Sequence, residues 1–304
     1  MSKNKYLKKI YDITITIIIF IIGKLFALLP LKLNNFLCRK LGSFAYLISR
    51  KRRKQALENL FYAFPDYTTK QRKNIAKQSF QNLSINLGEI FIIRTINENN
   101  LEKIIHYNNV DTLKEIQKRN KGILFLSGHF GNWEILAYSM GILAKTPITI
   151  IVKPQSNNYI DNIINKIRTY SGNKIVSMYS AARTIVDVIQ KGKSVALLVD
   201  QAATKDKDIY VDFFNRPAST YKVLAKLALK FNIPIIITFA IRQKNNKYVA
   251  DIKELDFSDL KYNQEDIVEL TKRHVKILED VIRQYPEQWT WMHKRWKHSP
   301  PNKL

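Results

Sequence analysis

The sequence is short of cysteine, glycine, proline and acidic residues. A single cysteine, Cys38, excludes a disulfide framework and any zinc site built from cysteines. Nine glycines and nine prolines in 304 residues exclude collagen-like and low-complexity chains. The 25 acidic residues face 50 basic ones, which leaves a net charge of +25. The partners of such a chain are expected to be anionic: nucleic acid, lipid head groups, or a phosphorylated or acidic ligand.

Several common catalytic motifs are also missing. The chain has no dinucleotide-binding glycine motif, no Walker loop, no H-E-x-x-H zinc motif and no G-x-S-x-G nucleophile turn. No pattern of zinc fingers, helix-turn-helix or RNA-binding aromatics stands out, so we expect no nucleic-acid partner. No group of His, Cys and carboxylates occurs at metal-ligand spacing, so we expect neither a metal nor another cofactor.

The N-terminal region is both apolar and basic. Residues 1–57 contain thirteen Lys and Arg but one acidic residue, Asp12. The most apolar run, residues 13–30, follows four lysines and is close to the length that spans a bilayer. A signal peptide looks similar, but no small-residue cleavage site follows, so we interpret the run as a retained membrane anchor. Whether it spans the bilayer or lies in the interface stays open.

A second segment extends this membrane signature. Apolar residues recur at steps of three and four, which predicts one apolar face of a helix; they are Leu33, Phe36, Leu37, Leu41, Phe44 and Ile48. Basic residues 39–40 and 50–54 accompany that face, as in helices that lie on anionic membranes. The alternative is a helix that packs on a protein core, followed by a solvated charge run. We expect residues 1–60 to form a membrane-binding region and residues 61–304 to form the catalytic domain.

The remainder of the chain alternates helical and strand patterns. Residues 70–107 have a helical and mostly amphipathic pattern. Apolar, β-branched runs then predict strands at 122–127, 148–152, 174–178, 194–199, 234–241 and 248–253, with helices at 133–144, 159–171, 181–191, 219–231 and 264–285. Nearly continuous apolar strands separated by helices predict an α/β fold with a mostly parallel central sheet flanked by helices.

One heptapeptide, residues 128–134, stands out chemically. It reads Gly-His-Phe-Gly-Asn-Trp-Glu and lies between a predicted strand and a predicted helix. Asn132 is a plausible helix N-cap, which puts Glu134 in the first helical turn. Open α/β sheets bind ligands at the carboxyl ends of their strands, and His129 is at such an end.

A histidine and a carboxylate so placed suit acid–base catalysis. A neutral histidine can take a proton from a hydroxyl at pH 7, and a carboxylate on its other ring nitrogen stabilises the imidazolium. We therefore expect His129 to be the general base and Glu134 to orient it. A capped turn with a buried histidine is the alternative that H-x4-E spacing alone leaves open.

The wider string resembles the signature of the bacterial lipid A biosynthesis acyltransferase family (lauroyl and myristoyl type), within the H-x4-D/E glycerolipid acyltransferases. Further matches follow in family order: Lys153-Pro154, Arg168, Asp200-Gln201, 211–214, 218–220 and the C-terminal string Tyr-Pro-Glu-Gln-Trp-Thr-Trp-Met-His-Lys-Arg-Trp-Lys at 285–297. Two positions depart from the family pattern, with Lys153 in place of the usual Arg and Asn215 in place of a Gly. The resemblance covers nearly the whole chain from about residue 50.

The resemblance implies a defined reaction and place. An acyl chain moves from acyl carrier protein to a hydroxyl of a lipid A precursor, at the bacterial inner membrane, with the catalytic domain facing the cytoplasm. His129 and Glu134 would be catalytic, no covalent intermediate or metal would be required, and the membrane partner would be anionic lipid. The candidate substrate-binding residues are Asn132, Lys153, Arg168, Asp200, Gln201 and Arg295.

Alternatives stay open at this point for most of these residues. Lys153 and Arg168 would hold a phosphate of the sugar or of the donor, or be solvated surface charges. Asp200 would order a polar network or cap a loop. Trp289, Trp291 and Trp296 would be core, phosphate contacts with neighbouring basic residues, or an interfacial belt. For the protein as a whole, the alternatives are acylation of another glycolipid or of a glycerophospholipid, and a non-catalytic protein that binds anionic lipid.

Overall fold

The central sheet of the protein, in a computed structural model that describes residues 3–203 and 208–299, has six strands. Their order is β11-β8-β2-β5-β3-β4, and every neighbouring pair is parallel except β11 with β8. The strands are β2 (Leu124–Ser127), β3 (Ile148–Val152), β4 (Lys174–Ser177), β5 (Ser194–Leu198), β8 (Ile235–Ile237) and β11 (Lys253–Leu255). The predicted α/β class with a mostly parallel sheet is confirmed.

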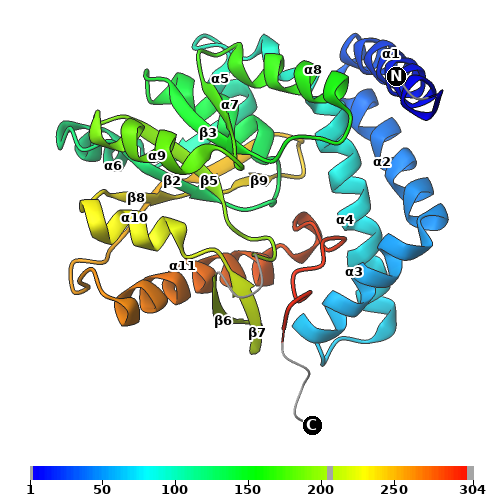
Figure 1. Ribbon diagram of the computed structural model, residues 1–304. Helices are drawn as coiled ribbons and strands as arrows, with labels where there is room; N and C mark the ends of the chain where they lie inside the picture. The colour runs from blue at the N-terminus through cyan, green and yellow to red at the C-terminus, as the bar shows by residue number, and fades with distance from the viewer. Residues whose placement is uncertain (1–2, 204–207, 300–304) are drawn as a thin grey trace.

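Helices cover both faces of this sheet (Figure 1). Side chains alternate along a strand, so Leu124 and Leu126 of β2 pack on one side while Phe125 packs on the other. The first side is covered by α9 (Ala181–Gln190), α10 (Val223–Phe231) and α11 (Gln264–Gln284). The second side is covered by α6 (Val110–Lys118), α7 (Trp133–Leu143) and α8 (Asn158–Thr169). The two layers of apolar side chains fix the sheet and thereby the strand ends that carry the site.

Two smaller sheets accompany the central one. Strands β1 (Ile105–Asn108), β10 (Tyr248–Asp251) and β9 (Ala240–Arg242) form the first, and β6 (Ile209–Phe213) pairs with β7 (Arg216–Thr220) in an antiparallel hairpin. Short helical segments are α5 (Leu101–Ile104), η1 (Ile93–Thr95) and η2 (Pro286–Gln288).

Four predicted boundaries are wrong. The strand expected at 234–241 is two strands, β8 and β9, which belong to different sheets. The helix expected from residue 219 begins at Val223, because residues 216–220 pair with β6. The strand expected at 248–253 likewise divides into β10 and β11. The helical pattern expected over 70–107 ends at Glu89, and β1 closes that segment. In the first three cases, and for β1 in the fourth, strand pairing between distant residues overrides the local pattern.

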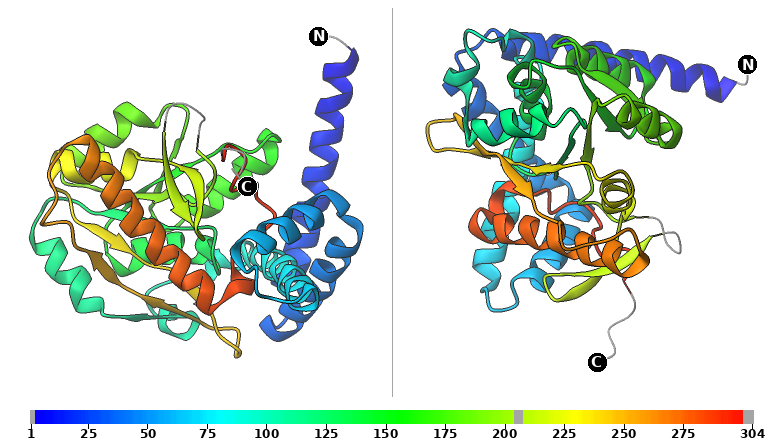
Figure 2. Two further views of the ribbon diagram at one scale, coloured as in Figure 1. Left: turned by 90° about the horizontal axis from the view of Figure 1, so that it is seen from below. Right: turned by 90° about the vertical axis from the view of Figure 1, so that its left-hand side faces the viewer.

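The N-terminal helices lie along one side of this body. They are α1 (Lys3–Ala27), α2 (Leu31–Ile48), α3 (Arg50–Ala63) and α4 (Thr69–Glu89), so the boundary expected at residue 60 falls inside α3. Figure 2 shows the N-terminal end of α1 extending beyond the body, while further along the helix Thr16 accepts from Asn157 at the start of α8 at 3.2 Å. Residues 7–27 of α1 are long and apolar enough to cross a membrane, with a mean hydropathy of 2.0, and only 11% of the most apolar stretch is buried.

Helix α2 packs on α4 with its small and polar residues. Gly42 lies against the backbone of Gln81, Gly88 of α4 lies against Cys38, and Asn34 and Asn35 are buried. The apolar residues of α2 point outward instead, with Phe36 54% and Phe44 59% exposed. The predicted apolar face of this helix therefore does not pack on the protein core.

Candidate active site

His129 lies in the turn between β2 and α7, at the carboxyl end of the central sheet. The turn is held from several sides. Asn132 caps α7 by accepting from the backbone N–H groups of Glu134 and Ile135, at 3.1 and 3.0 Å, which confirms the predicted N-cap. Gly131 has a positive φ of 53°, and a Cβ there would lie 1.8 Å from the carbonyl oxygen of Ala240. Only glycine fits this turn.

The carboxylate that contacts the imidazole is Asp200, not Glu134. Asp200 Oδ1 lies 2.8 Å from Nδ1 of His129, and Oδ2 accepts the backbone N–H of His129 at 2.9 Å. The expected contact between Glu134 and the ring is wrong because β5 is next to β2 in the sheet. Ser127 of β2 pairs with Leu198 of β5, and His129 and Asp200 each lie two residues beyond that pair. The two side chains therefore meet at the same end of the sheet.

The Asp200 carboxylate is buried and fully engaged. Its side chain is 2% exposed, and Nε1 of Trp289 donates to Oδ2 at 2.9 Å. Burial by itself would raise the pKa of Asp200, but the charge of His129 and the hydrogen bonds from His129 and Trp289 lower this pKa to about 2. Asp200 is therefore ionised at neutral pH, and three of its roughly four acceptor positions are used within the protein. Its contact with substrate stays a prediction.

The imidazole of His129 is 24% exposed and has a raised pKa. Burial lowers the pKa, but the charge of Asp200, its hydrogen bond and the charge of Glu134 outweigh that effect. With Nδ1 donating to Asp200, Nε2 is the nitrogen that can take a proton. Gln201, also expected in the site, has its amide nitrogen 3.3 Å from both ring nitrogens. The arrangement matches a base held by a buried carboxylate.

Glu134 forms an ion pair with Arg168 beside the histidine. The guanidinium binds both carboxylate oxygens, with Nε to Oε2 at 2.8 Å and Nη2 to Oε1 at 2.5 Å. Trp133 adds an indole hydrogen bond to Glu134, and its ring packs edge-on against the His129 ring. Burial would raise the pKa of Glu134, but Arg168 lowers it overall. The structure thus joins two predicted residues in a pair that the sequence did not indicate.

The other predicted substrate-binding residues divide into exposed and buried ones. Lys153 is exposed just after β3, at the same edge of the sheet as His129. Asn132 is fully buried, with its oxygen on the α7 cap and its nitrogen on Glu89 at 2.8 Å. Arg295 is buried and donates to the carbonyl of Ser219 and the hydroxyl of Thr220. Both side chains are buried and bind protein groups, and their contact with substrate stays a prediction.

The C-terminal string supplies site residues whose roles the sequence left open. Trp289 binds Asp200, and Thr290 binds the His129 carbonyl through its backbone N–H and its hydroxyl, at 3.2 and 2.9 Å. Trp289, Trp291 and Trp296 are all buried, so they belong to the core and not to an interfacial belt. Apolar periodicity could not assign them, and the match to a family string was the available signal.

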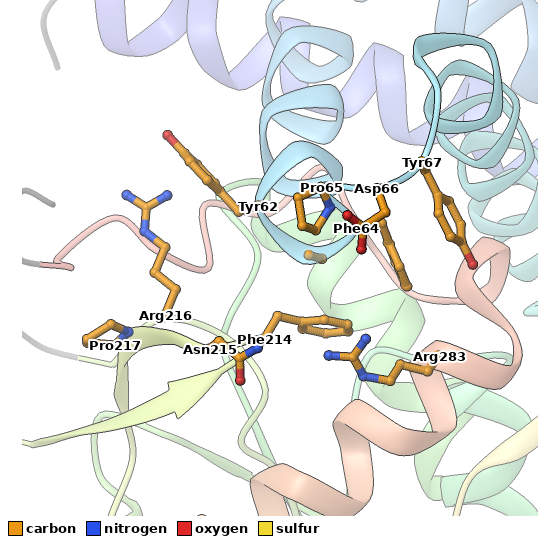
Figure 3. Close-up of a pocket in the computed structure, with 11 residues that line it drawn as sticks. Tyr62, Phe64, Pro65, Asp66, Tyr67, Phe214, Asn215, Arg216, Pro217 and Arg283 are labelled. Atoms are coloured by element: carbon orange, nitrogen blue, oxygen red, sulfur yellow. The ribbon is translucent and has the colours of Figure 1, made fainter. Parts of the chain in front are cut away.

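A pocket of about 500 Å³ lies away from these residues (Figure 3). It is formed by the end of α3, the link to α4, the β6–β7 turn and Arg283 of α11. Aromatic side chains and two arginines line it, including Tyr62, Phe214 and Arg216. None of the predicted site residues is in its lining, so pocket size does not identify the candidate active site here.

The fold is an α/β fold whose parallel sheet carries a paired histidine and aspartate at the carboxyl ends of two strands. The whole chain from residue 2 to 298 matches the family of bacterial lipid A biosynthesis acyltransferases. The protein belongs to this family, and is thus an acyltransferase of lipid A biosynthesis whose acceptor is a lipid A precursor.

Named relatives agree with this assignment. The lipid A biosynthesis palmitoleoyltransferase of Escherichia coli is 24% identical over 90% of this chain and 87% of its own length. A lipid A biosynthesis acyltransferase of Haemophilus influenzae is 25% identical, over 88% and 83%. The lipid A biosynthesis myristoyltransferase of Escherichia coli is 20% identical, over 91% and 85%. These names differ in the acyl chain they specify, so they do not fix the chain that this protein transfers.

Proposed function

We propose that the protein transfers a fatty acyl chain from acyl carrier protein to a secondary hydroxyl on a lipid A precursor. The observation that carries the mechanism is the contact of His129 Nδ1 with the buried, ionised Asp200. It leaves Nε2 to remove the proton of the acceptor hydroxyl, because the imidazolium that forms is stabilised by the carboxylate.

The reaction can proceed by direct transfer, without a covalent enzyme intermediate. The acceptor oxygen attacks the thioester carbonyl as His129 takes its proton, and a tetrahedral intermediate forms. The carbon–sulfur bond breaks, the ester remains, and His129 returns the proton to the thiolate of the donor. Glu134 and Arg168 stay paired beside the ring, where Glu134 adds negative charge that favours the imidazolium. Lys153, exposed at the same sheet edge, is suited to bind a phosphate of either substrate.

The membrane part of the proposal concerns residues 1–60. We infer that α1 inserts into the bacterial inner membrane and that α2 lies at the membrane surface with Phe36 and Phe44 toward lipid. The basic residues at 39–40 and 50–54 would bind anionic head groups, each contributing about 1 kcal/mol near the surface. Because acyl carrier protein is cytoplasmic, residues 61–304 would face the cytoplasm.

The donor and acceptor are tested with purified protein. A lipid A precursor is incubated with acyl carrier protein or coenzyme A carrying the same acyl chain, and products are measured by mass spectrometry. We expect transfer from the carrier protein, with one added acyl group on an existing hydroxyacyl chain. Equal or faster transfer from coenzyme A would overturn the donor, and addition directly to the sugar would overturn the acceptor position.

Membrane binding is tested by fractionation of a variant that lacks residues 1–30. We expect part of it to stay with membranes at low salt and part of that fraction to be released at high salt, since salt screens the basic contacts. The remainder would be held by the apolar face of α2. Complete solubility at low salt would contradict the surface role of α2.

A further inference from the structure

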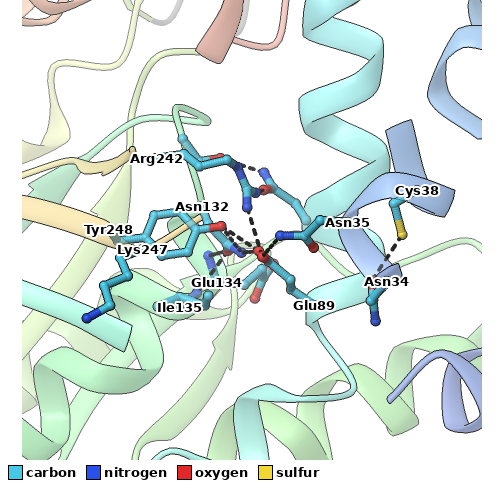
Figure 4. A network of polar contacts seen from close by, with 12 residues as sticks. Asn34, Asn35, Cys38, Glu89, Asn132, Glu134, Ile135, Arg242, Lys247 and Tyr248 are labelled. Carbon is cyan, nitrogen blue, oxygen red and sulfur yellow. Dashed lines mark hydrogen bonds and ion pairs between the residues drawn. The ribbon is translucent and has the colours of Figure 1, made fainter. Parts of the chain in front are cut away.

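A buried cluster of polar side chains lies behind the catalytic turn (Figure 4). This Glu89 cluster comes from five elements and comprises Asn35 of α2, Asn86 and Glu89 of α4, the N-cap residue Asn132, Arg242 of β9 and Tyr248 of β10. All six side chains are buried. Burying an ion pair and four further polar side chains lowers stability unless each group has hydrogen-bond partners. A cluster of this kind, when its groups are paired, holds those groups in one arrangement, so we expect it to position the elements it joins.

The Glu89 carboxylate accepts hydrogen bonds from four side chains. Oε1 accepts from Arg242 at 2.8 Å and from Asn35 at 3.3 Å. Oε2 accepts from Asn132 at 2.8 Å and from the hydroxyl of Tyr248. An ionised carboxylate offers about four acceptor positions, so this one is saturated by donors.

The cluster reaches the turn at two adjacent residues. Because the Asn132 nitrogen donates to Glu89, its oxygen faces α7 and accepts from Glu134 N and Ile135 N. One residue earlier, the carbonyl of Gly131 accepts from Asn86 at 2.5 Å, while the oxygen of Asn86 accepts from Arg242 at 2.7 Å. The side-chain amides of Asn132 and Asn86 therefore each have one orientation in which both the oxygen and the nitrogen are hydrogen-bonded.

We propose that Glu89 is a positioning residue for acyl transfer: its carboxylate orients Asn132, and Asn132 fixes the turn that aims His129. The inference rests on the proposed function. The turn has little room to adjust, since Gly131 already lies against Ala240 and Asn132 N donates to the Ala240 carbonyl at 3.2 Å. A displaced Asn132 would move the histidine three residues earlier, while the surfaces that bind substrate would stay in place.

A pairwise exchange tests this directly. Glu89→Gln presents an amide N–H to the donating nitrogen of Asn132, and Asn132→Asp presents a carboxylate to the carboxylate of Glu89. Combining the two restores a complementary pair with the total charge of the parent, because the amide introduced on α4 donates to the carboxylate introduced at the N-cap. That carboxylate still caps α7.

We expect each single variant to lose about tenfold or more in kcat, as misplaced catalytic groups do. KM for the lipid A precursor should stay within about twofold, and the double variant should recover most of the lost kcat.

Glu279→Gln is the matched control. Glu279 is also buried, accepts the backbone N–H of Phe214 at 2.6 Å and pairs with Arg283 at 2.8 Å, but it does not contact the turn. We expect it to lower the thermal midpoint without changing kcat. A loss of kcat in Glu279→Gln as large as in Glu89→Gln would show a general stability effect and overturn the proposal, as would a folded double variant that stays as slow as the singles.

A spectroscopic readout separates this proposal from the proposed function. The chain has five histidines, so the ring carbon signals of a histidine-labelled sample can be assigned, with that of His129 identified by its loss in His129→Ala. The single variants should shift the His129 signal, and the double variant should bring it back to its position in the parent.

If the parent transfers no acyl group, the proposed function fails, and this signal still decides the role of Glu89. An unmoved His129 signal in folded single variants would overturn that role. If neither single variant folds, a folded double variant with parental kcat and signal supports it.

Discussion

The turn that carries His129 and helix α2 bury different kinds of side chain. At the turn, large apolar side chains such as Phe130 and Trp289 fill the core, and the buried carboxylate of Asp200 is paired with His129. In α2, small and polar side chains point inward, while Phe36, Phe44 and their neighbours face out. The first pattern is that of a protein packed in water. The second is typical of a helix whose outer surroundings are apolar.

An amphipathic pattern therefore has two meanings in this chain. Both regions have apolar residues at helical or strand periods, and in the body these residues mark the core. In α2 they mark the exterior, because Gly42 and Gly88 let α2 and α4 approach closely without large apolar side chains between them. Breaking each region should therefore affect different properties: turnover at the turn, membrane binding at α2.

The largest effect is expected at the base. His129→Ala should reduce acyl transfer by about 100- to 10,000-fold, the usual cost of removing a general base. The protein should remain folded and membrane-bound, because neither property depends on this ring. The measurement is the initial rate with acyl carrier protein as donor, with His106→Ala as control, since His106 is an exposed histidine on β1. A rate within a few-fold of the parent would refute the base assignment.

Asp200→Asn should be the next most damaging change. The amide cannot stabilise the imidazolium and cannot accept from Trp289, the His129 backbone and the ring together. We expect a loss of about 100-fold or more in kcat. The control is Asp187→Asn, at an exposed position of α9. Near-parental kcat in Asp200→Asn would mean that another group holds the tautomer.

Glu134→Gln should be milder, with a loss of about 10- to 100-fold. It removes a charge that favours the imidazolium and breaks the pair with Arg168. Losing one partner of a buried ion pair costs up to about 3 kcal/mol of stability. A double variant with Arg168→Gln should regain part of that stability but not the rate. If the rate returned with the stability, Glu134 would have a structural role only.

Acid is expected to lower the free energy of unfolding through Asp200 at the turn. The pKa of Asp200 is about 2 in the folded protein, below its ordinary value of 3.8, so folding favours the ionised form. Its contribution, about 2 kcal/mol, is present above pH 4 and is lost as the pH falls through about 2. Urea unfolding at pH 6 and pH 3 should show a smaller acid-induced loss in the double variant His129→Ala, Asp200→Asn than in the parent. Both residues are replaced because burial lowers the pKa of His129 once Asp200 is removed, and protonating that ring would itself cost stability in acid. An equal loss would place the acid-sensitive groups elsewhere.

The smallest effect on stability is expected on α2. Replacing Phe36 and Phe44 by serine should change the free energy of unfolding by less than about 0.5 kcal/mol per site, because both are exposed. Binding to vesicles with anionic lipid should nevertheless fall several-fold. Tyr262→Ser removes an exposed aromatic from the body and should leave vesicle binding unchanged. A lowered thermal midpoint in the α2 variant would indicate that these rings pack on protein.

The sequence was sufficient for the parts that depend on neighbours in the chain. Strand and helix periodicity predicted β3 at its full length and α7 to within a residue, and Asn132 was recognisable as a cap from the residues around it. The heptapeptide and the C-terminal string were enough to indicate the family, because they keep a particular order of chemically unusual residues. The apolar, basic N-terminal segments were equally visible.

Which carboxylate contacts His129 depends on the order of the strands in the sheet. Asp200 lies 71 residues away and comes to the ring because β5 lies beside β2, although β3 and β4 intervene in the chain. Glu134 is close in sequence, yet the first turn of α7 directs it to Arg168 of α8. The outward direction of Phe36 and Phe44 was undecided for the same reason. A local pattern determines which residues share a face of a helix or strand. The order of the strands and the packing of the helices determine which residues or surroundings that face contacts.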